Sequence, residues 1–409
     1  MGGPDVYHQR TAGVLLVAAE VALSMLPLAN VRVLDLSRLL PGPFATLALA
    51  DLGAQVDKLE DLEGGDYLRH MPPPHGAESA MFAALNRNKR SLALDLKHAD
   101  GKSTFLSMLP HYDVLIEQFR PGVMDRLGIG YATLHERNPR LIICSLTGYG
   151  QTGPLRNAAG HDLNYLARSG VLGLQGPTGV APQVPAFQVA DIGGALWSAF
   201  GIVTALYERT ITHKGKIIDI SMLEANMGFA ALAFGNVLAG HPPARGDDTL
   251  SGGLSVYGAY RAKDGFVTIA ALEPKFWLRF AAAVGIEADL SALLPGPHQV
   301  ALRAQLATLF AARTRAEWEA FARQHDCCVE PVLESDELQR DRQLVARQAF
   351  TTVATKAGPL TQLNTPLTPR DRTHSEAPRK GEHTRTILRE AGVSDQAIEA
   401  LFDRKIIAE

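Results

Sequence analysis

Short apolar and β-branched runs alternate with helix-length amphipathic stretches from Val31 onward. A short buried run followed by a helical pattern is typical of βαβ units, in which a crossover helix makes successive strands parallel. The predicted strands span residues 31–36, 54–60, 91–96, 113–117, 141–146 and 216–221. The sequence therefore predicts an α/β fold built on a largely parallel sheet.

The pattern changes in the second half of the chain. Residues 241–253 are polar and glycine-rich, which predicts a boundary. A hairpin signal follows at Lys263-Asp264-Gly265, between two β-rich runs. Helical patterns then dominate to about residue 350. Residues 351–378, rich in Pro and Thr, predict extended or irregular chain, and residues 381–407 predict a final pair of helices.

Composition describes an ordinary globular protein. With 409 residues, of which 46% are hydrophobic, the chain can bury a large core and form more than one domain. The formal net charge of -3 gives no reason to expect a nucleic-acid partner. Cys327 and Cys328 are adjacent and total cysteine is only 3, which favours a reducing, cytoplasmic location over a disulfide framework. No metal-ligand spacing is present, so we expect no metal site.

An apolar run near the start of the chain, residues 11–29, is interrupted by Glu20 and Pro27. A bilayer span requires about 20 uninterrupted apolar residues, so we expect no membrane span. The run fits an amphipathic surface helix or an extension upstream of a natural start near Met25. A secretory hydrophobic region, with Arg10 before it, is a third interpretation.

Two loops at the ends of predicted strands are candidate ligand-binding elements. The turn over residues 37–43 follows the first strand, at the edge where open α/β sheets bind ligands. Residues 86–90 (NRNKR) carry three cations at the entrance of another strand. Arginine and lysine pair well with phosphate oxygens, so this loop is either a phosphate site or an ordinary solvated loop.

His161 and Asp162 follow a glycine-rich turn and place a proton-transfer group beside a potential nucleophile. Asp191 precedes Gly193 and Gly194 near the start of a long apolar stretch, and Glu273 precedes Pro274 at the entry of a predicted helix. Each of these side chains could instead be a helix N-cap. Their joint occurrence favours catalysis, because an acid/base mechanism needs several such groups.

Three motifs together resemble those of the family III CoA-transferases, and within them the α-methylacyl-CoA racemase branch. They are FRPGVMDRLG at residues 119–128, GYGQTGP at 148–154 and GEHT at 381–384. The resemblance extends from Val31 to Ile407.

The resemblance implies a Rossmann-like large domain, a smaller α+β domain and an intertwined homodimer that binds acyl-CoA. It implies no cofactor beyond the CoA moiety of the substrate. The expected parts are an N-terminal extension of unclear role over residues 1–29, a large CoA-binding domain with the catalytic His and Asp over 30–220, a linker and small domain over 221–350, and a segment over 351–409 that returns to the large domain.

The resemblance also implies the CoA contacts. Leu40 and Pro41 would lie near the adenosine, and Leu94, Phe119, Val123 and Arg126 would line the nucleotide. Lys89 and Arg90 are candidate phosphate partners on grounds of charge. Many family members carry arginine after the acidic end of the second strand, where this chain has Asp61. Arg69 or Arg38 would then supply part of the phosphate contact.

For catalysis, the resemblance implies two alternatives. In a racemase, Asp191 and His161 would exchange the α-proton of a 2-methyl-branched acyl-CoA on opposite faces through an enolate, with Glu273 orienting the imidazole. In a CoA-transferase, Asp162 would attack the thioester and form a covalent intermediate. A non-catalytic CoA-binding protein is a weaker third interpretation. The sequence favours the racemase, and it does not identify the acyl group.

Overall fold

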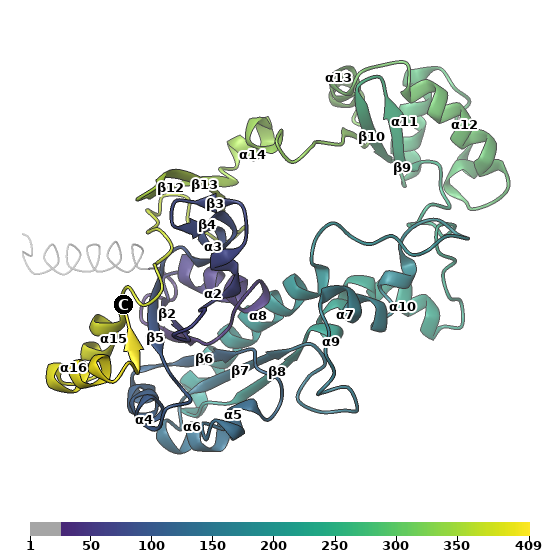
Figure 1. The fold of residues 1–409 in the computed structure, drawn as a ribbon. Helices are drawn as coiled ribbons and strands as arrows, with labels where there is room; N and C mark the ends of the chain where they lie inside the picture. Colours follow the sequence, from purple (N-terminus) through teal and green to yellow (C-terminus); the bar gives the residue numbers. More distant parts are fainter. Residues whose placement is uncertain (1–25) are drawn as a thin grey trace, which may run out of the picture. The chain divides into compact units, whose positions relative to one another are not determined.

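A central sheet organises the first part of the computed structural model, which describes residues 26–409 (Figure 1). Its strand order is β14-β5-β2-β1-β6-β7-β8, and all neighbours are parallel except β14 and β5. The strands are β1 (Arg32–Asp35), β2 (Gln55–Glu60), β5 (Lys89–Leu94), β6 (Val114–Glu117), β7 (Ile142–Thr147), β8 (Ile217–Ser221) and β14 (Ile407–Ala408). The predicted parallel sheet is confirmed.

The chain folds into two units and enters the first one three times. The first unit contains residues 26–159, Asp191–Met222 and Gln348–Glu409, and the second contains Gly160–Ala190 and Leu223–Arg347. The second unit thus includes the turn with His161, in a segment that we expected in the large domain. The apolar run over residues 11–25 lies outside the described residues.

Helices cover both faces of the sheet, so its strands are buried on both sides. Val33 of β1 packs in one hydrophobic cluster, together with residues of α2 (Pro41–Asp51) and α8 (Val189–Thr212). Its neighbour Leu34 packs in another, together with α4 (Ala99–Met108). Adjacent strand residues face opposite sides. This double burial explains why the strands are continuous apolar runs.

The further elements of the chain are shorter. They are β3 (Pro74–His75), β4 (Glu78–Ser79), α3 (Ala80–Asn86), α5 (Val123–Arg126), α6 (Tyr131–Arg137), α7 (Asp162–Arg168), α9 (Met222–Met227), α10 (Ala231–Leu238) and α14 (Arg342–Ala346). Helix α2 begins at Pro41, within the stretch 37–43 that we predicted to be a turn, because proline suits the first turn of a helix, where its missing N–H costs nothing.

Helix α8 contacts the sheet closely because two glycines face it. A Cβ at Gly194 would lie 3.0 Å from Leu146 Cδ1 of β7, and one at Gly201 would lie 3.2 Å from Ile218 Cγ2 of β8. By length and composition, α8 is the one helix of residues 26–409 that could cross a membrane. Its buried residues, including Ile202, pack in the core of the sheet. We therefore treat α8 as a core helix.

The second unit contains a three-stranded sheet of order β11-β10-β9, formed by β9 (Tyr257–Ala262), β10 (Gly265–Ala270) and β11 (Val329–Pro331). The predicted hairpin at Lys263-Asp264-Gly265 is confirmed as the antiparallel pair β9 and β10. Helices α11 (Pro274–Val284), α12 (His298–Phe310) and α13 (Arg315–His325) supply aromatic side chains to its core. The rings of Phe280 and Phe310, for example, stack with centroids 5.7 Å apart.

The returning segment is more ordered than we predicted. A hairpin of β12 (Phe350–Thr355) and β13 (Gly358–Leu363) forms in the stretch that we expected to be extended or irregular, since Phe, Val and Thr suit a half-buried strand pair. The predicted final helices are present as α15 (Thr384–Glu390) and α16 (Asp395–Asp403). The chain then adds β14 to the sheet edge beside β5.

A buried carboxylate, Asp51 at the end of α2, holds the returning segment. It accepts two hydrogen bonds from Arg87, from Nη2 at 2.6 Å and from Nε at 3.1 Å. Thr368 Oγ1 from the returning segment donates to the same carboxylate at 2.7 Å. The Asp51 and Arg87 side chains are fully buried. Removal of either side chain would therefore leave the other charge buried and unpaired, which costs free energy.

Asp51→Ala is expected to destabilise the first unit by about 3–5 kcal/mol, because it leaves the Arg87 charge buried and unpaired. Glu208→Ala is the matched control. It breaks only the exposed pair with Lys216 and should cost less than about 1 kcal/mol. Hydrogen exchange of the amides of β1 and β2 measures the opening free energy of this unit. Equal losses of opening free energy in the two variants would contradict the stabilising role of the buried pair of Asp51 and Arg87.

Candidate active site

The turn after β1 carries the candidate CoA contacts Arg38, Leu40 and Pro41. Asp35 Oδ1, at the end of β1, accepts hydrogen bonds from Ser37 N at 2.9 Å and from Ser37 Oγ at 2.5 Å. Burial alone would raise the pKa of Asp35, but the nearby lysines and these hydrogen bonds hold it below its usual value. The carboxylate thus remains ionised and fixes the first part of the turn.

Two further buried charges fix the rest of this turn. Lys58 Nζ donates to Ser37 O at 2.7 Å and pairs with Asp66 Oδ2 at 2.9 Å. Asp66 Oδ1 accepts the Leu39 N–H at 3.0 Å. Leu39 has a φ of 63°, a left-handed value that is strained for leucine. The ionic network therefore compensates for a turn that the sequence would not otherwise favour.

Lys89, a candidate phosphate partner, belongs to the same network. Its Nζ donates to Pro43 O and to Asn86 Oδ1, both at 2.9 Å, and lies 3.6 Å from Asp35 Oδ2. The side chain is fully buried. Burial lowers the pKa of Lys89 to about 7. A phosphate contact by Lys89 stays a prediction, and it would require the ammonium to leave these partners.

The other cations of the candidate CoA site differ in their ion pairing. Arg90 forms a bidentate pair with Asp57, and Arg69 forms one with Glu60. Arg38 instead stacks on the Tyr67 ring, with 4.6 Å from Cζ to the centroid, and donates to its hydroxyl. Among the described residues, no carboxylate forms an ion pair with Arg38 or with the exposed Arg126.

The remaining CoA candidates lie at the ends of β5 and β6. Leu94 is buried at the end of β5. Glu117, also buried, accepts the Phe119 N–H and the Tyr131 hydroxyl, both at 2.7 Å. These bonds fix the loop that carries Phe119 to Val123, where α5 begins. Glu117 was not among our sequence candidates, although a carboxylate that ends an apolar strand is a visible signal.

The candidate catalytic turn precedes α7. His161 is the N-cap residue, its side chain is exposed, and its backbone N–H donates to Asn164 Oδ1 at 3.0 Å. Tyr165 donates its hydroxyl to Gly160 O at 2.6 Å, which fixes the residue before His161. Asp162 Oδ1 accepts the Ala190 N–H at 2.7 Å. Asp162 thus caps the start of α8.

Asp191 and Glu273 also occupy helix N-termini. Asp191 lies half-buried in the first turn of α8, and Glu273 is the exposed N-cap of α11. Asp191 belongs to the first unit, whereas His161 and Glu273 belong to the second. Each catalytic candidate therefore stands at a helix N-terminus, where free N–H groups and the helix dipole favour negative charge. Sequence reasoning placed Asp191 and Glu273 correctly at these helix starts.

One neighbour of Glu273 was not anticipated. Burial raises the pKa of the Cys328 thiol, and the negative charge of Glu273 adds to the effect. Cys328 has a φ of 57° in the turn before β11.

Within residues 26–409, no group of three or more His, Cys, Asp or Glu residues could hold a metal ion. His, Asp and Glu side chains of this kind are suited to proton transfer, and a carboxylate can also act as a nucleophile.

The sequence matches the model of CoA-transferase family III over residues 28–384. The chain belongs to this family. An alpha-methylacyl-CoA racemase from Homo sapiens is 37% identical over 394 residues, which cover 93% of this chain and 97% of the relative. A succinyl-CoA:glutarate CoA-transferase from Mus musculus is 38% identical over 249 residues, which cover 61% of this chain and 57% of the relative.

Solved structures share the fold. A CAIB/BAIF family protein from Brucella suis superposes with a TM-score of 0.78 at 30% identity, covering 89% of this chain and 99% of that one. Rv3272 from Mycobacterium tuberculosis superposes with a TM-score of 0.75 at 27% identity, covering 88% and 98%. The fold and the family are therefore shown over nearly the whole chain.

Lys89 gives a testable pH dependence. Its pKa is about 7 in the folded protein and about 10.4 in an unfolded chain. Between these values the unfolded chain binds the proton and the folded one does not, so wild-type stability rises with pH by up to about 1.4 kcal/mol per unit. Lys89→Met should lack this rise in urea unfolding at pH 7, 8 and 9, whereas exposed Lys97→Met should retain it. If the stability of the wild type and of Lys89→Met changed with pH in the same way, the lowered pKa of Lys89 would be refuted.

Proposed function

We propose that the protein is an α-methylacyl-CoA racemase-like isomerase, which interconverts epimers of 2-methyl-branched acyl-CoA thioesters. The observation that carries the proposal is the different use of two adjacent side chains. Asp162, the nucleophile that a transferase would need, accepts the Ala190 N–H at the start of α8. His161 beside it presents its side chain to solvent. The turn therefore favours proton transfer by histidine over attack by aspartate.

The chemistry requires two bases. A thioester carbonyl acidifies its α-proton, and inversion needs removal of that proton on one face and return of a proton on the other. Asp191 would serve one face and His161 the other. Glu273 would accept a hydrogen bond from the imidazole and fix its tautomer. Backbone N–H groups around Gly160 to Asp162, or near the start of α8, would stabilise the enolate oxygen.

The relatives support this choice. The human racemase is 37% identical over 93% of this chain, whereas a succinate--glutarate CoA-transferase from Agrobacterium fabrum is 30% identical over 89% of it. The racemase by its printed name acts on alpha-methylacyl-CoA, and we propose the same substrate class here. We further propose that the protein acts in the cytoplasm.

Incubating each pure epimer of a 2-methylacyl-CoA in heavy water tests the racemase. The wild type should incorporate deuterium at the α-carbon from both epimers. Asp191→Asn should lose exchange from one epimer and His161→Ala from the other, each by at least about 100-fold, because each base serves one face. Asp162→Asn keeps an oxygen for the Ala190 N–H and should retain exchange. Absence of deuterium in wild-type product would refute the proposal.

A CoA-transferase is the alternative, supported by the mouse and other transferase relatives. It predicts that hydroxylamine traps Asp162 as an acyl derivative and that turnover requires a free carboxylic acid. In that case Asp162→Asn would abolish activity, and Asp191→Asn would spare the trapped intermediate. CoA binding without exchange or transfer would instead favour a non-catalytic CoA-binding protein.

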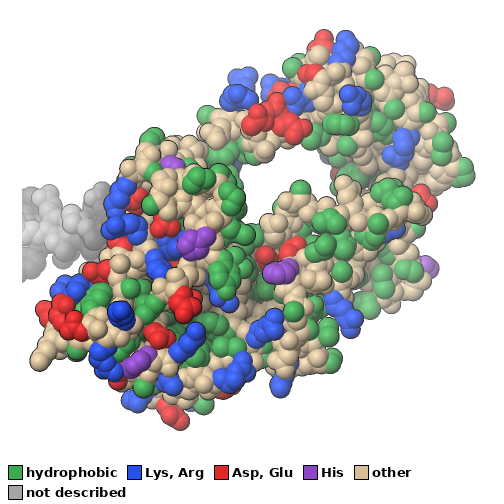
Figure 2. Space-filling model, viewed as in Figure 1, with side chains coloured by type: hydrophobic (Ala, Val, Ile, Leu, Met, Phe, Trp, Pro, Cys, Tyr) green, Lys and Arg blue, Asp and Glu red, His purple; other side chains and the backbone are tan. Residues whose placement is uncertain are grey.

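We also propose the intertwined homodimer. Leu196, Phe200, Tyr207 and Ile211 lie on one face of α8 and are at least half exposed, from 50% for Leu196 to 70% for Tyr207. Figure 2 shows further hydrophobic side chains at the surface near α10, where Leu238 is exposed. An exposed apolar face such as that of α8 usually marks an interface, and a second copy of the chain is the occupant that we propose.

The dimer predicts twice the chain mass in sedimentation velocity. Phe200→Asp combined with Tyr207→Asp should produce the single-chain mass, because two carboxylates would be buried in an apolar interface. Val300→Asp changes an equally exposed side chain on α12 and is the matched control, which should remain dimeric. A wild-type protein that sediments as a single chain at all micromolar concentrations would contradict this assignment.

A further inference from the structure

The cations around the loop after β2 divide into two classes. Arg69 forms ion pairs with Glu60 and with Glu78, so its charge is neutralised inside the protein. Arg38 and Lys380 contact the same loop without an ion pair to any carboxylate among the described residues. A cation that binds a phosphate must have charge to offer. Arg38 and Lys380, which form no ion pair, are therefore the candidates for a phosphate contact.

Lys380 comes from the returning segment, and its side chain reaches the loop after β2. Its Nζ donates to Leu62 O at 2.6 Å and lies 3.4 Å from Glu63 O. Its stem lies over Gly65, where a Cβ would come within 3.0 Å of Lys380 Cδ. Gly65 has a φ of 65°, which glycine adopts without strain. The loop thus seats a half-buried ammonium on carbonyl oxygens alone.

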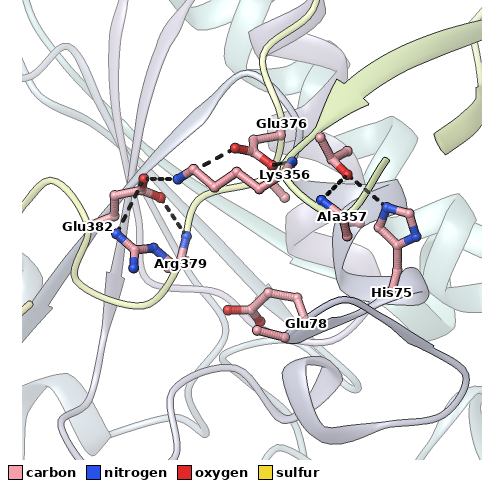
Figure 3. A pocket seen from close by; sticks show the side chains of 11 residues that line it. His75, Glu78, Lys356, Ala357, Glu376, Arg379 and Glu382 are labelled. Atoms are coloured by element: carbon pink, nitrogen blue, oxygen red, sulfur yellow. Dashed lines mark hydrogen bonds and ion pairs between the residues drawn. The ribbon is translucent and has the colours of Figure 1, made fainter. Parts of the chain in front are cut away.

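Neighbouring cations on the same segment are used differently. Figure 3 shows Lys356, Glu376, Arg379 and Glu382 pointing toward one another in a pocket between the returning segment and the β3–β4 hairpin. Lys356 Nζ lies 2.9 Å from Glu382 Oε1 and 3.6 Å from Glu376 Oε1, and Arg379 Nη2 lies 3.8 Å from Glu382 Oε1. These charges balance within the pocket. Lys380, one residue after Arg379, is the exception.

Asp61 is the acidic neighbour of Lys380, and its carboxylate is directed into its own loop. Oδ1 accepts the N–H groups of Gly64 at 2.8 Å and Gly65 at 3.1 Å. Burial acts to raise the pKa of Asp61, but the backbone N–H bonds outweigh it, and the positive charge of Lys380, which forms no ion pair with Asp61, also helps to keep the pKa below the usual value. The carboxylate shapes the turn, and the ammonium above it stays without an ion pair.

We propose that Lys380 binds the ribose phosphate of the CoA moiety and so determines specificity for CoA over dephospho-CoA. In open α/β sheets the loop after the second strand meets the nucleotide ribose, and a cation there accommodates a ribose phosphate. Lys380 supplies this cation from a segment about 320 residues away in sequence. The inference rests on the proposed function only in taking a CoA thioester as the ligand.

Calorimetric titration of the whole protein with CoA and with dephospho-CoA tests the proposal without turnover. The wild type should bind CoA roughly 10-fold more tightly than dephospho-CoA, a typical gain for one charge-assisted contact. Lys380→Gln should bind the two ligands equally, by weakening CoA alone. Lys380→Arg should restore most of the preference. Added salt should reduce the wild-type preference, because the contact is electrostatic.

Arg379→Gln is the matched control, since it removes the same charge one residue earlier from a side chain paired with Glu382, and it should keep the wild-type preference. Equal weakening of both ligands in Lys380→Gln would indicate a structural role and overturn the proposal. If that variant does not fold, a wild-type protein without preference for CoA overturns it equally. Tight CoA binding without deuterium exchange would refute the racemase alone.

Discussion

The buried ionic network beneath the turn after β1 is the constraint on which the rest of the structure depends. Asp35, Lys58 and Lys89 place charges inside a sheet whose strands also bury many apolar side chains. Burial of charge is costly unless each group has partners. Here the partners are the backbone and side chains of the turn itself, so the cost is offset only in one conformation. The network therefore specifies the shape of the ligand-facing edge of the sheet.

The path of the chain between the two units is the second feature that organises the structure. It leaves the first unit at residue 160, returns for α8 and β8, leaves again at residue 223 and returns at Gln348. The first two crossings lie beside the catalytic candidates His161 and Asp191, and Asp162 there caps Ala190. The final return brings Thr368 to Asp51 and Lys380 to the loop after β2. The returning segment thus completes the first unit and contributes side chains to its ligand-facing edge.

Much of the fold could be predicted from local sequence, because doubly buried strands are apolar runs and the hairpin at residues 263–265 has its own turn chemistry. The functional side chains at helix starts were also visible, since Asp191 and Glu273 precede glycines and a proline. The ion pairing of the cations could not be predicted. Both Arg90 and Arg69 were candidate phosphate partners, and only the tertiary fold brings Asp57 and Glu60 to them.

We infer that availability of charge, rather than its presence, distinguishes the cations suited to bind a ligand from the structural ones in this protein. A cation that already forms a buried salt bridge can bind a phosphate only by leaving its carboxylate. That carboxylate would then be buried and unpaired, which costs free energy. Arg38, which stacks on the Tyr67 ring, and Lys380, which lies on two carbonyl oxygens, would leave no carboxylate unpaired. The same reasoning separates Asp162 from His161, because a carboxylate that caps a helix must break that contact before it can attack a thioester. Function in this fold therefore depends on the polar groups that the core leaves without an opposite charge.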